Sequence, residues 1–436
     1  MRATWSVFVV ALGVRSGVAL AQAPAVTLAT TPVEATPPPG AREAAEARAE
    51  EEATRMQPDR RVPGSGTAAP GGTGDETEGD RRPGVQFHGF LDAYYAYNFN
   101  QPSSNLSALR AYDSQHDVFT LGNAVLTSTF RLGRVSGHLA LQTGTLAGFY
   151  RPTGALGALG LGTLWRSLQE AALSWEAPVG RGLRVDAGLF AVPFGPEEVA
   201  VYRNWNHSHS LLFYHLPYQQ LGARAVYSAT QRSRLALGVY NGWDQVPGDA
   251  NRSKSVSLEY TWHGERVYFD LEYYVGVERP ADAPTGAYAR HTVDSYVAWD
   301  ASPSVSVMAH VNTGFEPNRV GTQAWFGGAL YARFRLRPWL FLALRADAFT
   351  ESAPPAVLDG PSPTAVFQPE ATWAGSGTFT LDARPHEHVS FRLEYRHDLA
   401  NGMAYYRDNA ARDLTGRLVP NAGLQDTLLL GATAWF

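Results

Sequence analysis

Much of this chain consists of strand-length segments in which charged and apolar residues alternate, so that the two faces of each strand differ in character. One face of residues 323–337 carries Trp325, Tyr331 and a run of arginines, whereas the other carries Phe326 and Leu330. A slip of one residue would move those arginines into lipid, at about 2–4 kcal/mol each near a bilayer midplane. The alternation therefore fixes the register, but it suits either a membrane barrel or a solvated β-sandwich.

The connections between strands favour a membrane barrel. Short turns and long connections alternate strictly along the chain, as they do in bacterial barrels with periplasmic turns and extracellular loops. The sequence therefore predicts an all-β, up-and-down antiparallel transmembrane β-barrel of about sixteen strands. The predicted strand cores are 86–99, 119–131, 134–147, 167–177, 182–192, 219–229, 231–241, 253–263, 265–276, 290–300, 303–313, 322–337, 338–349, 369–382, 387–398 and 424–436. The predicted long connections are 100–118, 148–166, 193–218, 242–252, 277–289, 314–321, 350–368 and 399–423.

The C-terminal segment has the pattern of a barrel-closing strand. Leu428, Leu430 and Phe436 share one face of residues 427–436, and Phe436 is the last residue. Outer-membrane barrels end in this way, with the terminal aromatic residue on the lipid-facing side. We therefore predict that Phe436 is an assembly signal for the barrel-assembly machinery.

The N-terminal part has a different composition. A charged residue, an apolar run and a small-residue cleavage pattern predict a signal peptide at residues 1–21. Residues 22–84 are rich in Pro, Ala, Gly and Glu and have almost no large apolar side chain, which predicts a disordered periplasmic tail. The barrel is then predicted to be residues 85–436. The absence of cysteine suits an exported chain that does not use disulfides.

Aromatic residues recur near the ends of the predicted strands, where amphipathic rings suit the headgroup level. We expect them to form girdles around the barrel. They are Tyr94, Tyr95, Tyr97, Trp175, Trp262, Trp299, Trp339, Trp373 and Trp435.

Four segments carry motifs that can be compared with a known family. They are the opening Gly89-Phe-Leu-Asp-Ala-Tyr-Tyr-Ala-Tyr-Asn-Phe-Asn-Gln-Pro102, Pro193-Phe-Gly-Pro-Glu-Glu198, Asn204-Trp-Asn-His-Ser-His-Ser-Leu-Leu-Phe213 and Asn241-Gly-Trp-Asp244. Together they resemble the second type of outer-membrane β-barrel porin family, over most of residues 86–436. The resemblance implies a porin-like barrel and does not specify a solute.

No set of residues makes a convincing catalytic or metal site, and no cofactor is predicted. Ser208 is a poor catalytic partner for His207, because neighbours in an extended segment point apart. A metal site could be drawn, but no spacing enforces it, and a polar loop is the simpler interpretation. Its ligands would be Glu197, Glu198, His207, His209 and His215. The chain has no phosphate-binding or dinucleotide motif, and no basic excess that would suggest nucleic acid.

The charged strand faces are predicted to line a water-filled lumen, where facing charges select solutes by size and charge. The simpler alternative is that they only keep the interior wet. Loop 193–218 is the candidate constriction, because its apolar residues suit folding into the barrel mouth better than standing in water. The candidate lumen and constriction residues are Glu197, Glu198, Arg203, His207, His209, Asp270, Glu272, Arg333, Arg335, Arg345, Arg392 and Glu394. Arg232 and Arg266 are assigned to the same inner face.

We therefore expect a channel in the bacterial outer membrane that lets small hydrophilic solutes or ions diffuse passively. Two alternatives remain open. One is a barrel enzyme, a lipid hydrolase or protease, which would need a serine, a histidine and a carboxylate or amide to converge. The other is an exported, soluble all-β binding protein. The expected partners are outer-membrane lipid, the assembly machinery and small polar solutes, with a homo-oligomer by analogy with other porins.

Overall fold

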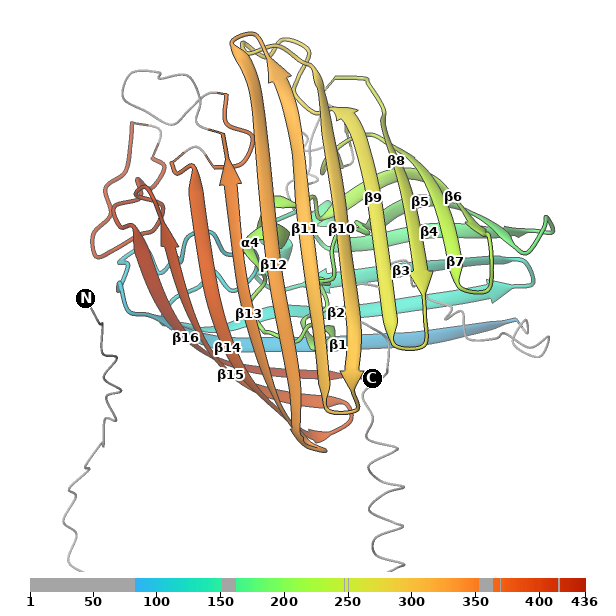
Figure 1. Cartoon of the computed structure of the whole chain (residues 1–436), viewed down its shortest axis with the longest axis horizontal. Coiled ribbons are helices and arrows are strands. Elements are labelled where there is room, and N and C mark those ends of the chain that lie inside the picture. The colour runs from blue at the N-terminus through green and yellow to red at the C-terminus, as the bar shows by residue number, and fades with distance from the viewer. Residues whose placement is uncertain are drawn as a thin grey trace, which may run out of the picture. The chain divides into compact units, whose positions relative to one another are not determined.

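The computed structural model describes residues 83–150, 162–246, 248–249, 251–352, 364–368, 370–414 and 416–436. Within these residues sixteen antiparallel strands form one closed barrel, in which each strand pairs with its sequence neighbours and β1 pairs with β16 (Figure 1). The predicted fold class and strand number are confirmed. The predicted signal peptide and nearly all of the predicted tail lie outside the described residues.

The strand bounds agree with the predicted cores to within a few residues. The strands are β1 (Gly84–Asn98), β2 (Phe119–Leu132), β3 (Val135–Thr143), β4 (Leu168–Ala177), β5 (Leu183–Ala191), β6 (Gln219–Ser228), β7 (Ser233–Tyr240), β8 (Ser255–His263), β9 (Val267–Val277), β10 (Ala289–Ser302), β11 (Val305–Asn318), β12 (Gly321–Arg337), β13 (Leu340–Glu351), β14 (Trp373–His386), β15 (Val389–Ala400) and β16 (Leu424–Trp435). Short helices occur only in connections of the described chain: η2 (Leu146–Gly148), α3 (Gly162–Arg166), η3 (Val201–Arg203) and α4 (Leu211–His215). None of the helices described is long and apolar enough to cross a membrane.

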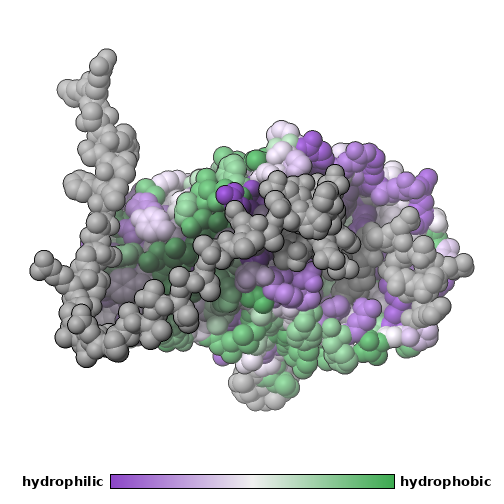
Figure 2. All heavy atoms as spheres, turned by 90° about the horizontal axis from the view of Figure 1, so that it is seen from below, coloured by the Kyte–Doolittle hydropathy of each residue, from purple (hydrophilic) through white to green (hydrophobic). Residues whose placement is uncertain are grey.

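The two faces of the strands separate as the alternation predicts. On β12, Trp325 and Tyr331 are buried inside the barrel, whereas Phe326 and Leu330 are exposed on the outer wall. On β9, Glu272 is fully buried while Leu271 is exposed. The face seen in Figure 2 accordingly carries broad apolar areas, drawn in green, over the barrel wall. The outer wall is therefore suited to lipid, and the charged residues are turned inward.

One connection differs from the predicted alternation of short and long joins. The segment 314–321 is predicted as a long loop, but β11 continues to Asn318 and β12 begins at Gly321, which leaves a tight turn. Ion pairs support this extended hairpin, because Glu316 accepts hydrogen bonds from Arg279 and Arg290. The prediction of a long loop there is wrong.

Two strands, β7 and β9, begin a few residues later than predicted, so two arginines assigned to their inner faces lie outside the strands. Arg232 lies in the exposed turn before β7, 3.7 Å from Glu265. Arg266 lies in the turn before β9 and donates to the backbone carbonyl of Asp300. Both arginines are therefore turn residues, and their assignment to the lumen is wrong.

Two of the aromatic residues assigned to the outer girdles face inward. Tyr94 is buried and donates to the carbonyl of Tyr112 in the loop after β1. Trp435 stacks on Tyr202 of the connection between β5 and β6, with ring centroids 4.8 Å apart. By contrast, Trp299 and Trp339 are about half exposed on the outside.

The barrel closes where the first and last strands meet. Gly89 and Phe436 exchange backbone hydrogen bonds of 3.2 and 3.0 Å, and Phe90 pairs with Trp435. The exposed ring of Phe436 covers Gly89, where an added Cβ would lie only 2.7 Å from Phe436 Cε1. A glycine at position 89 therefore leaves room for the terminal ring on the lipid-facing side.

Candidate functional site

The connection between β5 and β6, residues 192–218, runs inside the barrel, and we call it the plug loop. It contains η3 and α4, and Figure 1 shows α4 within the ring of strands. Ser210 caps α4, because its hydroxyl accepts a hydrogen bond from Phe213 N at 3.1 Å. Leu211 and Leu212 at the start of α4 are fully buried.

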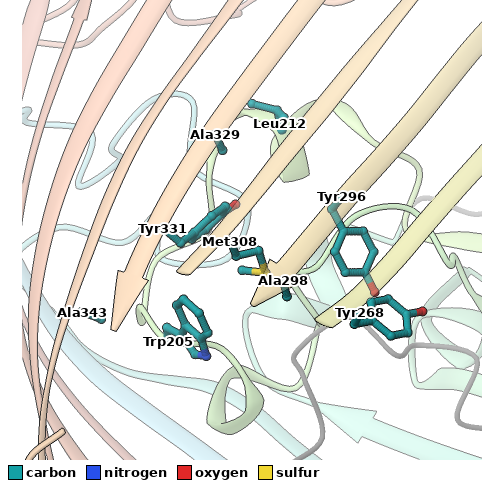
Figure 3. Packing of buried hydrophobic residues seen from close by; sticks show 9 residues of the cluster. All are labelled: Trp205, Leu212, Tyr268, Tyr296, Ala298, Met308, Ala329, Tyr331 and Ala343. Carbon is teal, nitrogen blue, oxygen red and sulfur yellow. The ribbon is translucent and has the colours of Figure 1, made fainter. Parts of the chain in front are cut away.

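Apolar contacts fix the plug loop to one part of the wall. Trp205 and Leu212 join a buried cluster with residues of β9 to β13. Figure 3 shows Trp205 beneath Met308 and Tyr331, and Leu212 beside Ala329. At the other end of the loop, Phe194 packs edge-on against Tyr274 of β9. The loop therefore crosses the lumen and lies against β9 to β16.

Three inward arginines hold the backbone of the plug loop, and we call them the arginine clamps. Arg392 of β15 donates to the carbonyls of Asn204 (2.7 Å) and Val201 (2.9 Å). Arg345 of β13 and Arg396 of β15 both donate to carbonyls in the segment Ser208–His209. Carbonyls in non-helical backbone need partners when they are buried, and charged donors make the stronger bonds.

Wall carboxylates bind the backbone N–H groups of the same loop. Glu394 accepts from His207 N and Ser208 N at 2.6 and 2.9 Å. Asp347 accepts from Leu211 N at 2.8 Å, and Asp294 accepts from Gly195 N at 2.9 Å. Charged wall residues therefore substitute for the water that this irregular backbone would otherwise require.

Within the plug loop, Glu197 closes a ring of polar contacts. Its carboxylate accepts from Ser210 N at 2.9 Å and from the Ser210 hydroxyl. It also pairs with Arg345 Nη1 at 3.0 Å, and both side chains are almost fully buried. Arg345 thus joins the wall, the start of the loop and the segment before α4.

His207 and His209 lie between the plug loop and the wall. His207 Nε2 is 3.8 Å from Asp92 Oδ1, and the ring lies against Gly431 of β16. His209 contacts Asn204 Nδ2 at 3.1 Å and packs on Phe213. Burial lowers the pKa of His209. Both imidazoles are at most 3% exposed, so they are packed between the plug loop and the wall.

Two further groups at the end of the plug loop have displaced pKa values. Burial lowers the pKa of His215 to about 3, and its ring stacks on Phe349 with centroids 4.0 Å apart. Burial raises the pKa of Asp244 to about 6, although its carboxylate accepts from Tyr218 N and Gln219 N. The return of the plug loop to β6 is thus fixed by a neutral imidazole and a poorly solvated carboxylate.

The other predicted constriction residues make contacts of their own, in the plug loop or on the wall. Glu198 pairs with Arg203 at 3.1 Å, and Arg203 is partly exposed. Arg333 lies between the rings of Trp205 and Phe341, 5.2 and 5.3 Å from their centroids. The structure therefore brings Glu197, His207, His209, Arg345, Arg392 and Glu394 together, but it separates them from Arg335 and from the pair Asp270 and Glu272.

Sequence reasoning missed a second inward contact, from the loop after β1. Arg110 forms an ion pair of 2.7 Å with Asp398 and also reaches Thr427. Tyr112 of this loop packs edge-on against His209 and Phe213 of the plug loop. No local pattern could reveal these contacts, because the partners are far apart in sequence.

The lumen face of β5 to β9 carries charges of both signs. Arg184 and Arg224 both pair with Asp186, at 3.0 and 2.9 Å. Glu259, Asp270 and Glu272 follow on β8 and β9. The hydrogen bonds and ion pairs described above tie the plug loop to β1, β10 and β13 to β15 instead. A polar strip of wall therefore lies beside the plugged part, and the two meet at β9, where Phe194 packs against Tyr274.

The plug loop does not form a hydrolytic or metal-binding arrangement in the described residues. The hydroxyl of Ser208 contacts Arg345 at 3.2 Å, and that of Ser210 contacts Glu197. Across the part of the chain that the structure describes, no group of three or more His, Asp or Glu side chains could hold a metal ion.

A closed antiparallel barrel with an apolar outer wall and a loop folded into its charged interior is the architecture of an outer-membrane porin-like channel. The family comparison agrees: the model of the beta-barrel porin-2, OmpL-like family matches residues 84–435. The chain belongs to this family, and it is a porin-like channel of the bacterial outer membrane.

Solved structures share the fold at low sequence identity. The outer membrane channel DcaP of Acinetobacter baumannii has a TM-score of 0.52 and 12% identity, over 83% of this chain and 99% of that chain. OmpT of Vibrio cholerae has a TM-score of 0.51 and 7% identity, over 81% and 97% of the two chains. An anion-selective porin from Comamonas acidovorans has a TM-score of 0.50 and 11% identity, over 81% and 100%. No curated protein matches the chain.

Proposed function

We propose that this porin-like channel passes small hydrophilic solutes or ions by passive diffusion, and that the plug loop narrows its lumen. The plug loop is bound to β13 and β15 through the arginine clamps and Glu394, and to β10 through Asp294. Solutes then pass along the polar strip of β5 to β9. The observation that carries the proposal is that the plug loop is fixed to one part of the charged barrel wall and, among the described residues, leaves the polar strip without such ties.

A hydrolytic role has no support from the plug loop. Catalysis by serine would need Ser208 or Ser210 beside an imidazole that a carboxylate orients. Instead, the serine hydroxyls contact Arg345 and Glu197, and His207 is 3.8 Å from the carboxylate of Asp92. We therefore propose a channel without catalytic activity.

The orientation and assembly of the barrel are also part of the proposal. The end of the barrel at which β1 begins and β16 ends faces the periplasm, as in other bacterial barrels. The N-terminal tail then lies in the periplasm. A homo-oligomer is proposed by analogy, since OmpT of Vibrio cholerae is known in a trimer form. Chemical cross-linking in outer-membrane vesicles would test it.

Single-channel recording in planar bilayers tests the channel directly. Replacing residues 197–214 by a short Gly-Ser linker should raise the unit conductance several-fold, because the plug loop would leave the lumen. The matched control removes residues 281–286, an outer connection, and should leave the conductance unchanged. If neither the wild type nor the shortened variant conducts, although both show the gel mobility of folded barrels, the proposal is wrong.

A further inference from the structure

Carboxylates gather on two neighbouring strands of the polar strip. Glu259 of β8 stands directly opposite Glu272 of β9, and Asp270 lies two residues from Glu272 on the same face. Residues opposite each other in a sheet have Cβ atoms about 5 Å apart, and like charges there repel. A barrel gains no stability from this arrangement unless something positive neutralises it.

Three oxygens of these side chains lack donors among the described residues. Glu272 is fully buried, and neither of its carboxylate oxygens has a hydrogen-bond partner among the described residues. The same holds for Asp270 Oδ1, whereas Asp270 Oδ2 accepts a hydrogen bond of 3.4 Å from the Tyr268 hydroxyl. A buried carboxylate without a partner is costly, so it must be protonated or meet a cation.

The uncharged hydroxyl of Thr261 is a second group beside these carboxylates that has no partner among the described residues. Thr261 stands opposite Asp270 in the register and shares the inner face of β8 with Glu259. Thr261 is 2% exposed, and its hydroxyl has no hydrogen-bond partner within the described chain. A threonine hydroxyl can act as an oxygen ligand, so it adds a neutral acceptor beside the carboxylates.

Neighbouring arginines offset part of this charge. Arg224 and Arg184, the arginines of β6 and β5, share their charge with Asp186, and Arg234 of β7 stands opposite Thr261. Asp294, the next carboxylate along the row, is already bound by His310, Asn312 and Gly195. The wall carboxylates Asp347 and Glu394 are likewise satisfied by the plug loop. Within the polar strip, Glu272 has no such partner among the described residues, and Asp270 has only the long contact with Tyr268.

We propose that Glu259, Asp270, Glu272 and the hydroxyl of Thr261 form a selectivity row for small monovalent cations such as K⁺. The described residues hold no cluster of three or more His, Asp or Glu side chains suited to one metal ion, which favours weakly held, partly hydrated ions over a chelated metal. Oxygen rings of this kind select ions in other channels. The inference rests on the proposed channel function and names its preferred solute.

Reversal potentials in a KCl gradient across a planar bilayer provide the first test. The wild type should prefer K⁺ over Cl⁻ several-fold. The double variant Asp270→Asn with Glu272→Gln should lose most of that preference, because shape and hydrogen-bonding capacity are retained while the charge is removed. Glu387→Gln, in an exposed turn, is the control and should match the wild type. A wild type that prefers Cl⁻, or a double variant with unchanged preference, overturns the selectivity row.

A second measurement separates this inference from the channel function. The melting temperature of the purified barrel should be higher in KCl than in N-methylglucamine chloride at equal ionic strength, and the double variant should lose the difference. If the protein shows this K⁺ effect but no conductance, cation binding stands and the channel function fails. If it conducts but shows neither K⁺ preference nor K⁺ stabilisation, the channel stands and the selectivity row fails.

Discussion

At the scale of single residues, Gly431 shows how a missing side chain positions the plug loop. A Cβ at this position would lie 2.4 Å from His207 Nδ1, so the imidazole fits against β16 only because residue 431 is glycine. Gly377 of β14 is also in a strand, but a Cβ there would meet nothing within 4 Å. The two positions form a natural pair for testing the contact.

Gly431→Ala should displace His207 and loosen the plug loop, whereas Gly377→Ala should not. We expect the first variant to lose about 1–3 kcal/mol of folding free energy, as is typical of overpacking. It should therefore melt at a lower temperature and show noisier single-channel currents. Equal melting temperatures and equal current noise in the two variants would contradict the role assigned to Gly431.

The buried imidazole of His215 predicts a loss of stability in acid. Its pKa in the folded barrel is about 3, below the ordinary value, so the unfolded chain binds the proton more readily. Stability should therefore be complete above about pH 6.5 and fall as the pH drops toward 3, by at most about 1.4 kcal/mol per pH unit. Asp244, whose pKa is raised to about 6, acts in the opposite direction below that pH.

Melting curves of the wild type and of His215→Phe between pH 7.5 and pH 4.5 isolate this effect. Phenylalanine keeps an aromatic ring against Phe349 but cannot be protonated, so the variant should lose less stability in acid. Parallel pH profiles for the two proteins would show that His215 does not titrate in this way.

At the scale of elements, the sequence predicted that the loop folds inward and that the wall charges face the interior, but it did not predict that these charges bind the loop backbone. The apolar residues within 193–218 predicted an inward loop, and alternation predicted that Arg345, Arg392 and Glu394 face the interior. Periodicity cannot distinguish a charge that faces water from one that binds a backbone carbonyl. That distinction depends on contacts such as Arg392 with Asn204, which are 188 residues apart.

Removal of one arginine clamp should free part of the plug loop. Arg392→Met leaves the carbonyls of Val201 and Asn204 and the carboxylate of Asp382 without this donor. We expect about 3–5 kcal/mol lower stability and a larger mean conductance, while Arg337→Met, at an exposed strand end, should resemble the wild type. An Arg392→Met barrel with wild-type conductance and melting temperature would show that the clamp is dispensable.

At the scale of the whole molecule, the sequence predicted the closed barrel and the number of its strands, because each strand carries its own two-faced pattern. The misplaced loop at 314–321 follows from a partner outside the local pattern, namely Arg290. The same limit explains why Arg110 was not recognised as a partner of Asp398. The inward direction of Trp435, by contrast, agrees with the alternation of β16, in which Leu428 and Leu430 face outward.

Loss of the terminal ring should impair barrel assembly. Deleting Phe436, or replacing it by Asp, removes the aromatic residue that covers Gly89 at the closing seam. We expect less protein inserted in the outer membrane and normal export to the periplasm, measured by membrane fractionation. Phe326→Ala, at another exposed aromatic position of the outer wall, is the control. Normal insertion of the deletion variant would contradict the assembly signal.

The N-terminal tail is predicted to act as a spacer, on the basis of its composition alone. Removing residues 24–80 should leave the barrel with unchanged heat-modifiable mobility on gels, since that segment has too few large apolar side chains to build a core. A clear fall in thermal stability of the truncated protein would assign the tail a structural role.

The seam between Gly89 and Phe436 has one more consequence. Because β1 and β16 are hydrogen-bonded neighbours, the order in which the chain visits the strands is not what closes the ring. A short peptide linking Phe436 to the start of β1, with new ends cut in the turn between β11 and β12, would give a circularly permuted chain with every strand pairing preserved. In such a chain Phe436 and the seam between β1 and β16 would no longer lie at the chain end. Its assembly would therefore reveal whether the cell recognises the last strand of the chain or the seam between β1 and β16.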